Sequence, residues 1–316
     1  MRKAKRLILR RHSLLFYIVM SLIVDAAAAV IAWPSGSDWR TVYTKANFKA
    51  DISTGSYVYY FDVGQADSSA IISKGEACLI DCGNRNNGDV VADKLDELGV
   101  DYLKYVLVTH AHYDHIGGLR ALLRRVDIGA VVISDWVPDD ESDATFLESI
   151  KRDCEEKNVG IIKLQTGLSV DVGDFTLDVV YSDDSAEDEN DRSAVIRAVN
   201  GKRKFLFTGD ATTKIEKVII ENGIDVDCDI LKAGHHGSKY STSTEFLYAT
   251  SPGLVIFSCG AENSYGHPSV ETRERVKALG VDWFRTDYNG DISVDAETLT
   301  VKPEHGYITD NTSKAA

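Results

Sequence analysis

The chain has little cysteine, little proline and fewer basic than acidic residues. Five cysteines among 316 residues are too few for a disulfide scaffold, and their odd number leaves at least one unpaired. Five prolines exclude a proline-rich stalk, and a hydrophobic content of 44% excludes a disordered chain. The 35 lysines and arginines face 49 aspartates and glutamates, which gives a formal net charge of −14. Bulk electrostatics therefore oppose nucleic acid binding, which would need a local basic track or bound metal cations.

The basic residues that are present gather at the amino terminus, where six of the first twelve residues are lysine or arginine. A largely apolar stretch follows from Leu14 to Trp33, with Asp25 as its only charge. Its length and basic flank are typical of a retained signal anchor, and alanines 26–29 also offer the cleavage frame of a signal peptide. Residues 1–33 are therefore predicted to export the rest of the chain. The product would be a single-pass membrane protein with an extracellular domain, or a secreted protein.

Beyond this stretch the chain divides into a linker, one large domain and a short tail. Residues 34–56 lack apolar periodicity and are predicted to be the linker. Strands are predicted at 57–63, 77–81, 105–110, 130–134, 176–180, 194–199, 204–210, 229–234 and 254–258, and helices at 89–99, 115–126, 143–158, 212–223 and 269–280. The acidic stretch 183–191 is predicted to be a solvated loop. The alternation predicts a layered α/β domain over 57–308, followed by a tail at 309–316.

The densest group of chemically active side chains is THAHYDHIGG, residues 109–118, between a predicted strand and a predicted helix. Side chains alternate along an extended segment, so His110 and His112 are expected on one face with their imidazoles converging. Asp114 is expected to cap the following helix and His115 to begin it, so both point to a neighbouring spot. Three imidazoles and one carboxylate suit Zn²⁺ or a similar divalent metal.

Three other predicted strands end in side chains that could complete a metal site. Asp210 ends one of them, where its carboxylate could bridge two metals. His235 and His236 end a second strand. Asp81 ends the third, and an aspartate beside histidines commonly orients a metal-bound imidazole. Together with the histidine cluster, these strand ends indicate one metal site.

At these residues the sequence resembles a known family. THAHYDHIGG, LIDCG, FTGD and GHHGS are similar to motifs of the metallo-β-lactamase superfamily. A narrower resemblance, to the metallo-β-lactamase domain of ComEC-type competence proteins, is carried by FDVGQADSSAII (61–72), NDRSAVIR (190–197), KAGHHGS (232–238), NSYGHPS (263–269) and RTDYNGDI (285–292). The likeness extends over roughly residues 57–302. It implies an αββα sandwich with the site on the rim where the two halves meet.

The resemblance also implies roles for individual residues. The family's metal ligands match His110, His112, Asp114 and His115, with Asp210 as the bridging carboxylate and Asp81 in the first motif. The family's last histidine matches His235 or His236. We expect His235 to bind metal and His236 or His267 to donate a proton to the leaving group.

Two departures from the family pattern are visible. Many members supply a histidine between the first cluster and the bridging aspartate, but the intervening stretch has none here. Asn190 or Ser193 stands about where that histidine would be, so the metal held by His110 and His112 is expected to bind weakly. The second departure is that no permease-like series of apolar segments accompanies the domain. The resemblance therefore supports the chemistry better than it supports competence.

These observations predict an exported metal-dependent hydrolase with two divalent metal ions, Zn²⁺ or Mn²⁺. Two such ions would lower the pKa of a water molecule and clamp the oxygens of an ester, while Asp210 orients the resulting hydroxide. The leading prediction is a phosphodiesterase or nuclease, whose substrate could be extracellular DNA. The alternatives are a phosphoesterase acting on a cell-wall or lipid headgroup, and a non-catalytic exported metal-binding domain. The sequence indicates no oligomeric state.

Overall fold

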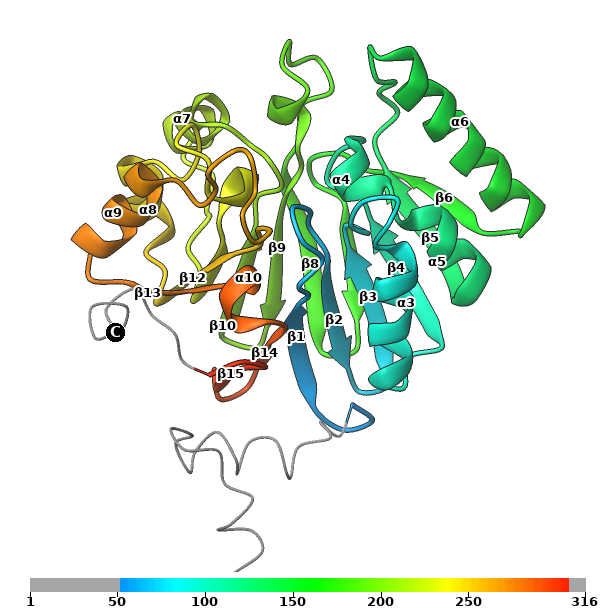
Figure 1. Cartoon of the computed structure of the whole chain (residues 1–316), viewed down its shortest axis with the longest axis horizontal. Helices are drawn as coiled ribbons and strands as arrows, with labels where there is room; N and C mark the ends of the chain where they lie inside the picture. The colour runs from blue at the N-terminus through cyan, green and yellow to red at the C-terminus, as the bar shows by residue number, and fades with distance from the viewer. Residues whose placement is uncertain (1–51, 307–316) are drawn as a thin grey trace, which may run out of the picture. The chain divides into compact units, whose positions relative to one another are not determined.

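The computed structural model describes residues 52–306, which form two stacked β-sheets with helices outside each of them (Figure 1). The predicted signal segment 1–33, the predicted tail 309–316 and all but the last few residues of the predicted linker lie outside the described residues. Within the described part, no helix combines the length and the apolar character that crossing a bilayer requires.

The first sheet has eight strands in the order β15-β14-β1-β2-β3-β4-β5-β6. Its strands are β1 (Ser56–Tyr60), β2 (Ser69–Ser73), β3 (Glu76–Ile80), β4 (Tyr102–Leu107), β5 (Asp127–Ile133), β6 (Gly160–Lys163), β14 (Ile292–Asp295) and β15 (Val301–Pro303). From β3 to β6 the strands run parallel. Apolar side chains of α3 (Gly88–Glu97), α5 (Leu119–Arg125) and α6 (Glu141–Glu156) cover its outer face.

The second sheet has seven strands in the order β13-β12-β11-β10-β9-β8-β7. They are β7 (Ser169–Val172), β8 (Phe175–Tyr181), β9 (Val195–Asn200), β10 (Arg203–Phe207), β11 (Ile230–Lys232), β12 (Leu254–Phe257) and β13 (Asp282–Arg285). From β10 to β13 the strands run parallel. Side chains of α7 (Thr213–Glu221), α8 (Thr244–Thr250) and α9 (Val270–Ala278) pack on its outer face, and α10 (Thr286–Asn289) follows β13.

The central strands of both sheets, such as β1, β2 and β12, are buried on two faces, which explains their nearly continuous apolar sequences. Along β1 successive side chains point to opposite faces. Tyr57 and Tyr59 join the core beneath the first set of helices, whereas Val58 and Tyr60 join the core between the sheets. A third core lies between the second sheet and its own helices. The predicted α/β class and αββα sandwich are therefore confirmed.

Each predicted strand and helix has a counterpart, but six short strands and the short helices α8 and α10 were not predicted. The missed strands β2, β6, β7, β13, β14 and β15 have three to five residues each, too few to show a clear period. The helix predicted at 115–126 is divided into α4 (Tyr113–Ile116) and α5. The residue that caps α4 is His112. The prediction that Asp114 caps this helix is therefore wrong, because Asp114 lies inside its first turn.

The break between α4 and α5 brings the start of α4 against the loop after β3. A Cβ atom on Gly118 would lie 2.1 Å from the carbonyl oxygen of Cys82, so only glycine fits there. Main-chain hydrogen bonds from Cys82 N to His115 O (2.6 Å) and from Gly118 N to Gly83 O (3.0 Å) maintain the contact. Asp81, which ends β3, thereby comes to lie next to His115.

Candidate metal centre

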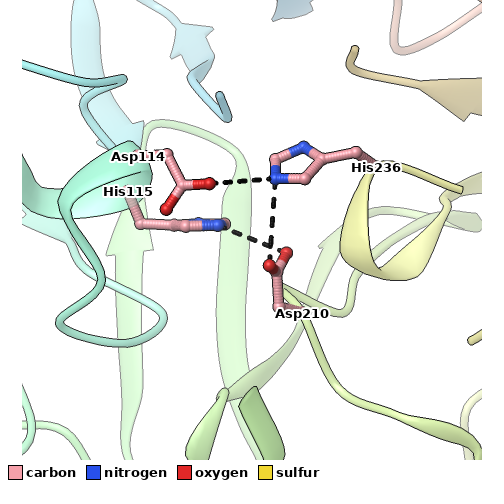
Figure 2. Close-up of side chains that lie close together, drawn as sticks. All are labelled: Asp114, His115, Asp210 and His236. Atoms are coloured by element: carbon pink, nitrogen blue, oxygen red, sulfur yellow. Dashed lines mark hydrogen bonds and ion pairs between the residues drawn. The ribbon is translucent and has the colours of Figure 1, made fainter. Parts of the chain in front are cut away.

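Four side chains meet beyond the ends of β4, β10 and β11 (Figure 2). Asp114 and His115 come from α4, Asp210 follows β10, and His236 lies in the short helical turn η2 (Gly234–Gly237) after β11. One ligand atom from each lies within 4.8 Å of the others. His115 Nε2 is 3.2 Å from Asp210 Oδ1, and His236 Nε2 is 3.3 Å from Asp114 Oδ2. We call these four residues the inner cluster.

In both imidazoles of the inner cluster, Nδ1 points away from the other ligands and contacts an oxygen atom of a neighbouring residue. His115 Nδ1 lies 2.8 Å from Asp81 Oδ2. Asp81 also accepts hydrogen bonds from the main-chain N and the hydroxyl of Thr109, both at 2.8 Å. His236 Nδ1 lies 3.0 Å from the carbonyl oxygen of Ser258. Such partners fix the ring orientation of a metal-binding histidine and leave the other nitrogen facing the ion.

The inner cluster has the composition of a metal site. His115 Nε2 and Asp210 Oδ1 are buried, and neither atom has a hydrogen-bond partner among the described residues. Buried polar atoms are nearly always partnered, so a nitrogen and an oxygen that face each other at 3.2 Å without a hydrogen bond are well suited to share a cation. Two imidazoles and two carboxylates suit a divalent ion such as Zn²⁺ or Mn²⁺. The residues present therefore fit one divalent cation.

Attraction between opposite charges dominates the protonation of the inner cluster. Burial disfavours the imidazolium form of His115, but Asp210 and Asp81 outweigh burial and hold its pKa well above the ordinary value. Burial is likewise outweighed at His236, where Asp210 and Asp67 raise the pKa to about 10. Burial would raise the pKa of Asp210, yet His115 and His236 hold it well below its usual range. A metal ion that binds here must displace protons, so its affinity should fall in acid.

His110 and His112, which we call the histidine pair, lie beside the inner cluster. His110 Nε2 is 2.9 Å from His112 Nδ1, as expected for two side chains on one face of an extended segment. The ring centroids of His110 and His115 are 4.1 Å apart. Two groups of three or more potential ligands converge in the described part of the chain, and neither includes the histidine pair. Burial, followed by the charge of His115, holds the pKa of His110 well below its ordinary value.

Glu189, in the acidic stretch 183–191, contacts the histidine pair. It was not among the site residues predicted from the sequence. Its Oε2 lies 2.7 Å from His112 Nε2. The hydroxyl of Ser193 instead accepts a hydrogen bond from the main-chain N of Asp210 at 3.0 Å. Asn190 lines a neighbouring cavity. The stretch is a loop, but the expectation of full solvation is wrong for Asp191, which is 2% exposed.

His235 and His236 lie differently, because both have positive φ, 48° and 53°, and the chain turns sharply between them. His236 belongs to the inner cluster. His235 lies at its edge, with Nε2 3.6 Å from Asp210 Oδ2. It borders a cavity of about 600 Å³ whose other lining residues are Glu187, Asp188, Asn190, Asp191, Thr212, Thr213, Lys214 and Tyr240. The expected ligand role of His235 therefore fits His236 better, and His235 is the histidine that faces the open space.

His267 lies near the site, but it forms no hydrogen bond with any residue of the inner cluster. Its ring centroid is 5.5 Å from that of His235, and its Nδ1 is 3.4 Å from Gln65 Nε2. Burial, with the positive charges of His236 and His235, lowers its pKa to about 4. His267 is therefore a neutral imidazole at pH 7, which makes it a weaker proton donor than the sequence analysis expected.

Known proteins resemble the chain over most of the described domain. ComE operon protein 3 of Bacillus subtilis (strain 168) is 30% identical over 196 residues, which are 61% of this chain and 25% of that protein. Competence protein ComA of Neisseria gonorrhoeae is 29% identical over 235 residues, 74% of this chain and 31% of that protein. The chain thus spans about a quarter to a third of the length of these curated relatives.

Igni18, a metallo hydrolase from Ignicoccus hospitalis KIN4/I, is 15% identical in sequence. Its structure covers 75% of this chain and 98% of its own length, with a TM-score of 0.49. The expected resemblance to the metallo-β-lactamase domain of ComEC-type competence proteins is confirmed by the curated relatives. The family model described as "Metallo-beta-lactamase superfamily" matches residues 61–260. The chain therefore belongs to the metallo-β-lactamase superfamily, whose members are generally metal-dependent hydrolases.

Proposed function

We propose that the chain is an exported phosphodiesterase that uses two divalent cations. The inner cluster is the observation that carries this proposal, because its four ligand atoms converge within 4.8 Å and two of them lack hydrogen-bond partners. Asp114, His115, Asp210 and His236 would hold the first cation. His110 and His112 would hold the second, with Asp210 shared between the two.

The position of Asp210 supports a shared role. Its carboxylate contacts His115 and also acts on the protonation of His110, whose ring lies directly beside that of His115. Cations held on both sides of Asp210 would lower the pKa of a water molecule and neutralise the phosphoryl oxygens of a substrate. His235 borders the cavity and lies close to Asp210, so it is the imidazole best placed to exchange a proton with bound substrate.

The substrate class follows from the relatives and from the charge around the site. One relative is named a competence protein and another a recombination protein, which favours DNA as the substrate. The net charge of −14 and the carboxylates of Glu187 and Asp188 in the cavity oppose a long polyanion. That observation favours the second candidate, a small phosphodiester such as a lipid or cell-wall headgroup.

A substrate screen with the full chain, purified in detergent, tests the proposal. Bis(4-nitrophenyl) phosphate, single-stranded DNA, plasmid DNA and glycerophosphocholine would each be incubated with Zn²⁺, Mn²⁺ or Mg²⁺. We expect metal-dependent hydrolysis of at least one diester, lost in the Asp210→Asn variant. If neither DNA nor the small diesters are cleaved with any metal, while the protein binds metal, the phosphodiesterase assignment is refuted.

Export of the domain rests on the sequence of residues 1–33 and has its own test. Protease added to intact cells should digest the domain in place, or the domain should be recovered from the medium. Protection of the domain until the cells are lysed would contradict the argument from the basic flank.

A further inference from the structure

Two sequence motifs of the ComEC-like resemblance meet in a buried ion pair that the proposed chemistry does not use. Asp67 belongs to FDVGQADSSAII, and Lys232 begins KAGHHGS. Lys232 Nζ donates to Asp67 Oδ2 across 165 positions of sequence. The two side chains are only 3% and 6% exposed. The pair joins the loop between β1 and β2 of the first sheet to β11 of the second sheet.

The carboxylate of this pair reaches the metal-binding imidazoles from behind. Asp67 Oδ1 lies 3.2 Å from His236 Nδ1, and Asp67 Oδ2 lies 3.9 Å from His115 Nδ1. The opposite nitrogen of His236 is the one that faces Asp114 and Asp210. A continuous series of contacts therefore runs from Lys232 through Asp67 to the nitrogen that would bind the ion.

Stability alone is a weak explanation for such a pair. Burial of two charges carries a large desolvation cost, and apolar replacements of buried ion pairs are often neutral or stabilising. A role in the site is a better explanation, because Lys232 holds Asp67 against the imidazole of His236. The Asp67 carboxylate has Lys232 on one oxygen and His236 on the other. Asp67 Oδ1 is buried and has no hydrogen-bond partner among the described residues, so its 3.2 Å contact with His236 Nδ1 is an ion-pair contact rather than a hydrogen bond.

We propose that Lys232 is a positioning residue of the metal centre, which keeps Asp67 in place as the charged partner that orients His236 toward the ion. This inference rests on the proposed metal-binding role of the inner cluster. The carbonyl oxygen of Ser258 lies 3.0 Å from the same nitrogen of His236, so the ring has a second anchor. A carbonyl group carries no net charge, and the test must therefore separate the contribution of the charged partner from that of the carbonyl.

The test is the affinity of the full-length protein for Zn²⁺, measured by competition with a chromogenic chelator after metal removal. For Lys232→Met we expect the tighter site to lose about 10–100-fold in affinity, the usual effect of disturbing a partner behind a metal-binding histidine. Lys94→Met is the control, in a less buried ion pair whose side chains are 18% and 27% exposed. Lys94 Nζ also pairs with an aspartate that is distant in sequence, Asp291, at 2.7 Å. Both variants therefore remove a lysine from an ion pair between distant segments.

The control should bind Zn²⁺ like the unaltered protein, since neither Lys94 nor Asp291 contacts the inner cluster. Unchanged affinity in Lys232→Met would overturn the proposal, and so would an equal loss in both variants. If Lys232→Met does not fold, the double variant Lys232→Met/Asp67→Asn leaves no buried charge unpaired. A loss of affinity in that variant supports the proposal, whereas affinity like that of the unaltered protein overturns it. Because hydrolysis is not measured, these outcomes are independent of whether the substrate is a phosphodiester.

Discussion

The inner cluster and the histidine pair come from the same short motif but have different surroundings. His115 is completely buried, and its Nδ1 contacts Asp81, the residue that follows strand β3. The side chain of His112 is 25% exposed, and its Nε2 contacts Glu189. The side chain of Glu189 is 23% exposed and lies on a loop. Partners on strands are fixed by the hydrogen bonds of the sheet, whereas partners on loops are not. We therefore expect a tight site at the inner cluster and a weaker one at the histidine pair.

The same comparison applies to charge. Carboxylates surround the inner cluster and raise the pKa values of its imidazoles, so this region attracts cations strongly. The pKa of His110 is lowered instead, mainly by burial and then by the charge of His115. The two regions also differ in residue type, since the inner cluster has two carboxylates and the histidine pair has none. We expect the side chains behind the ligands to contribute to a difference in metal affinity between the two regions.

Asp210 is proposed to bind both cations, so its loss should have the largest effect. We expect Asp210→Asn to lower the rate of diester hydrolysis by about three orders of magnitude, equivalent to about 4 kcal/mol of activation free energy. Initial rates at saturating Mn²⁺, together with elemental analysis of the dialysed protein, measure this. A rate equal to that of the unaltered protein would show that the carboxylate has a structural role only.

The next largest effect should be a loss of affinity for the tight cation when His236 is replaced, but not when its neighbour His235 is replaced. His236→Ala should weaken the tight cation by about 100-fold or more, whereas His235→Ala should change its affinity by less than about threefold. Calorimetric titration of each variant with Zn²⁺ measures both. If His235→Ala is the variant that loses the ion, the assignment from the inner cluster is reversed and the sequence expectation stands.

The histidine pair should matter only for the second cation. His112→Ala should keep one equivalent of metal through dialysis but lose the stimulation by excess Mn²⁺. Two equally tight sites in the unaltered protein would refute the difference between the regions, and would mean that an unrecognised ligand completes the second site.

Glu189 should contribute a smaller share through His112. Glu189→Gln should weaken the second cation by about 10-fold, because an amide holds the imidazole less strongly than a carboxylate does. Glu187→Gln, in the same loop, is the control and should have no effect on that ion. Equal behaviour of the two variants in a Mn²⁺ titration would show that only the charge of the loop matters.

The smallest expected effect is a gain in affinity for the second cation. Asn190 lines the cavity beside His235, whereas Ser193 is fully buried and bonded to Asp210, so Asn190 is the position open to substitution. Asn190→His should tighten the second cation by a few-fold and lower the Mn²⁺ concentration needed for half-maximal activity. An unchanged Mn²⁺ requirement would show that this side chain does not reach the histidine pair.

Much of this architecture could be predicted because long apolar runs and the THAHYDHIGG segment are local patterns. Alternation along an extended chain correctly indicated that His110 and His112 face each other. The same rule could not separate His235 from His236, since the positive φ of both residues departs from an extended chain. Glu189 and Lys232 act across many positions of sequence, and no local pattern reveals such contacts. The acidic composition around Glu189 also hid it, because charged runs are usually solvated.

The inner cluster draws its ligands from both halves of the sandwich. Asp114 and His115 belong to the half built on the first sheet, and Asp210 and His236 to the half built on the second. A bound cation therefore acts as a cross-link between the halves, and its binding energy is added to the free energy of unfolding. At a free metal concentration a hundred times the Kd, this linkage is worth about 2.7 kcal/mol. Chelation should thus lower the melting temperature of the domain as well as its activity.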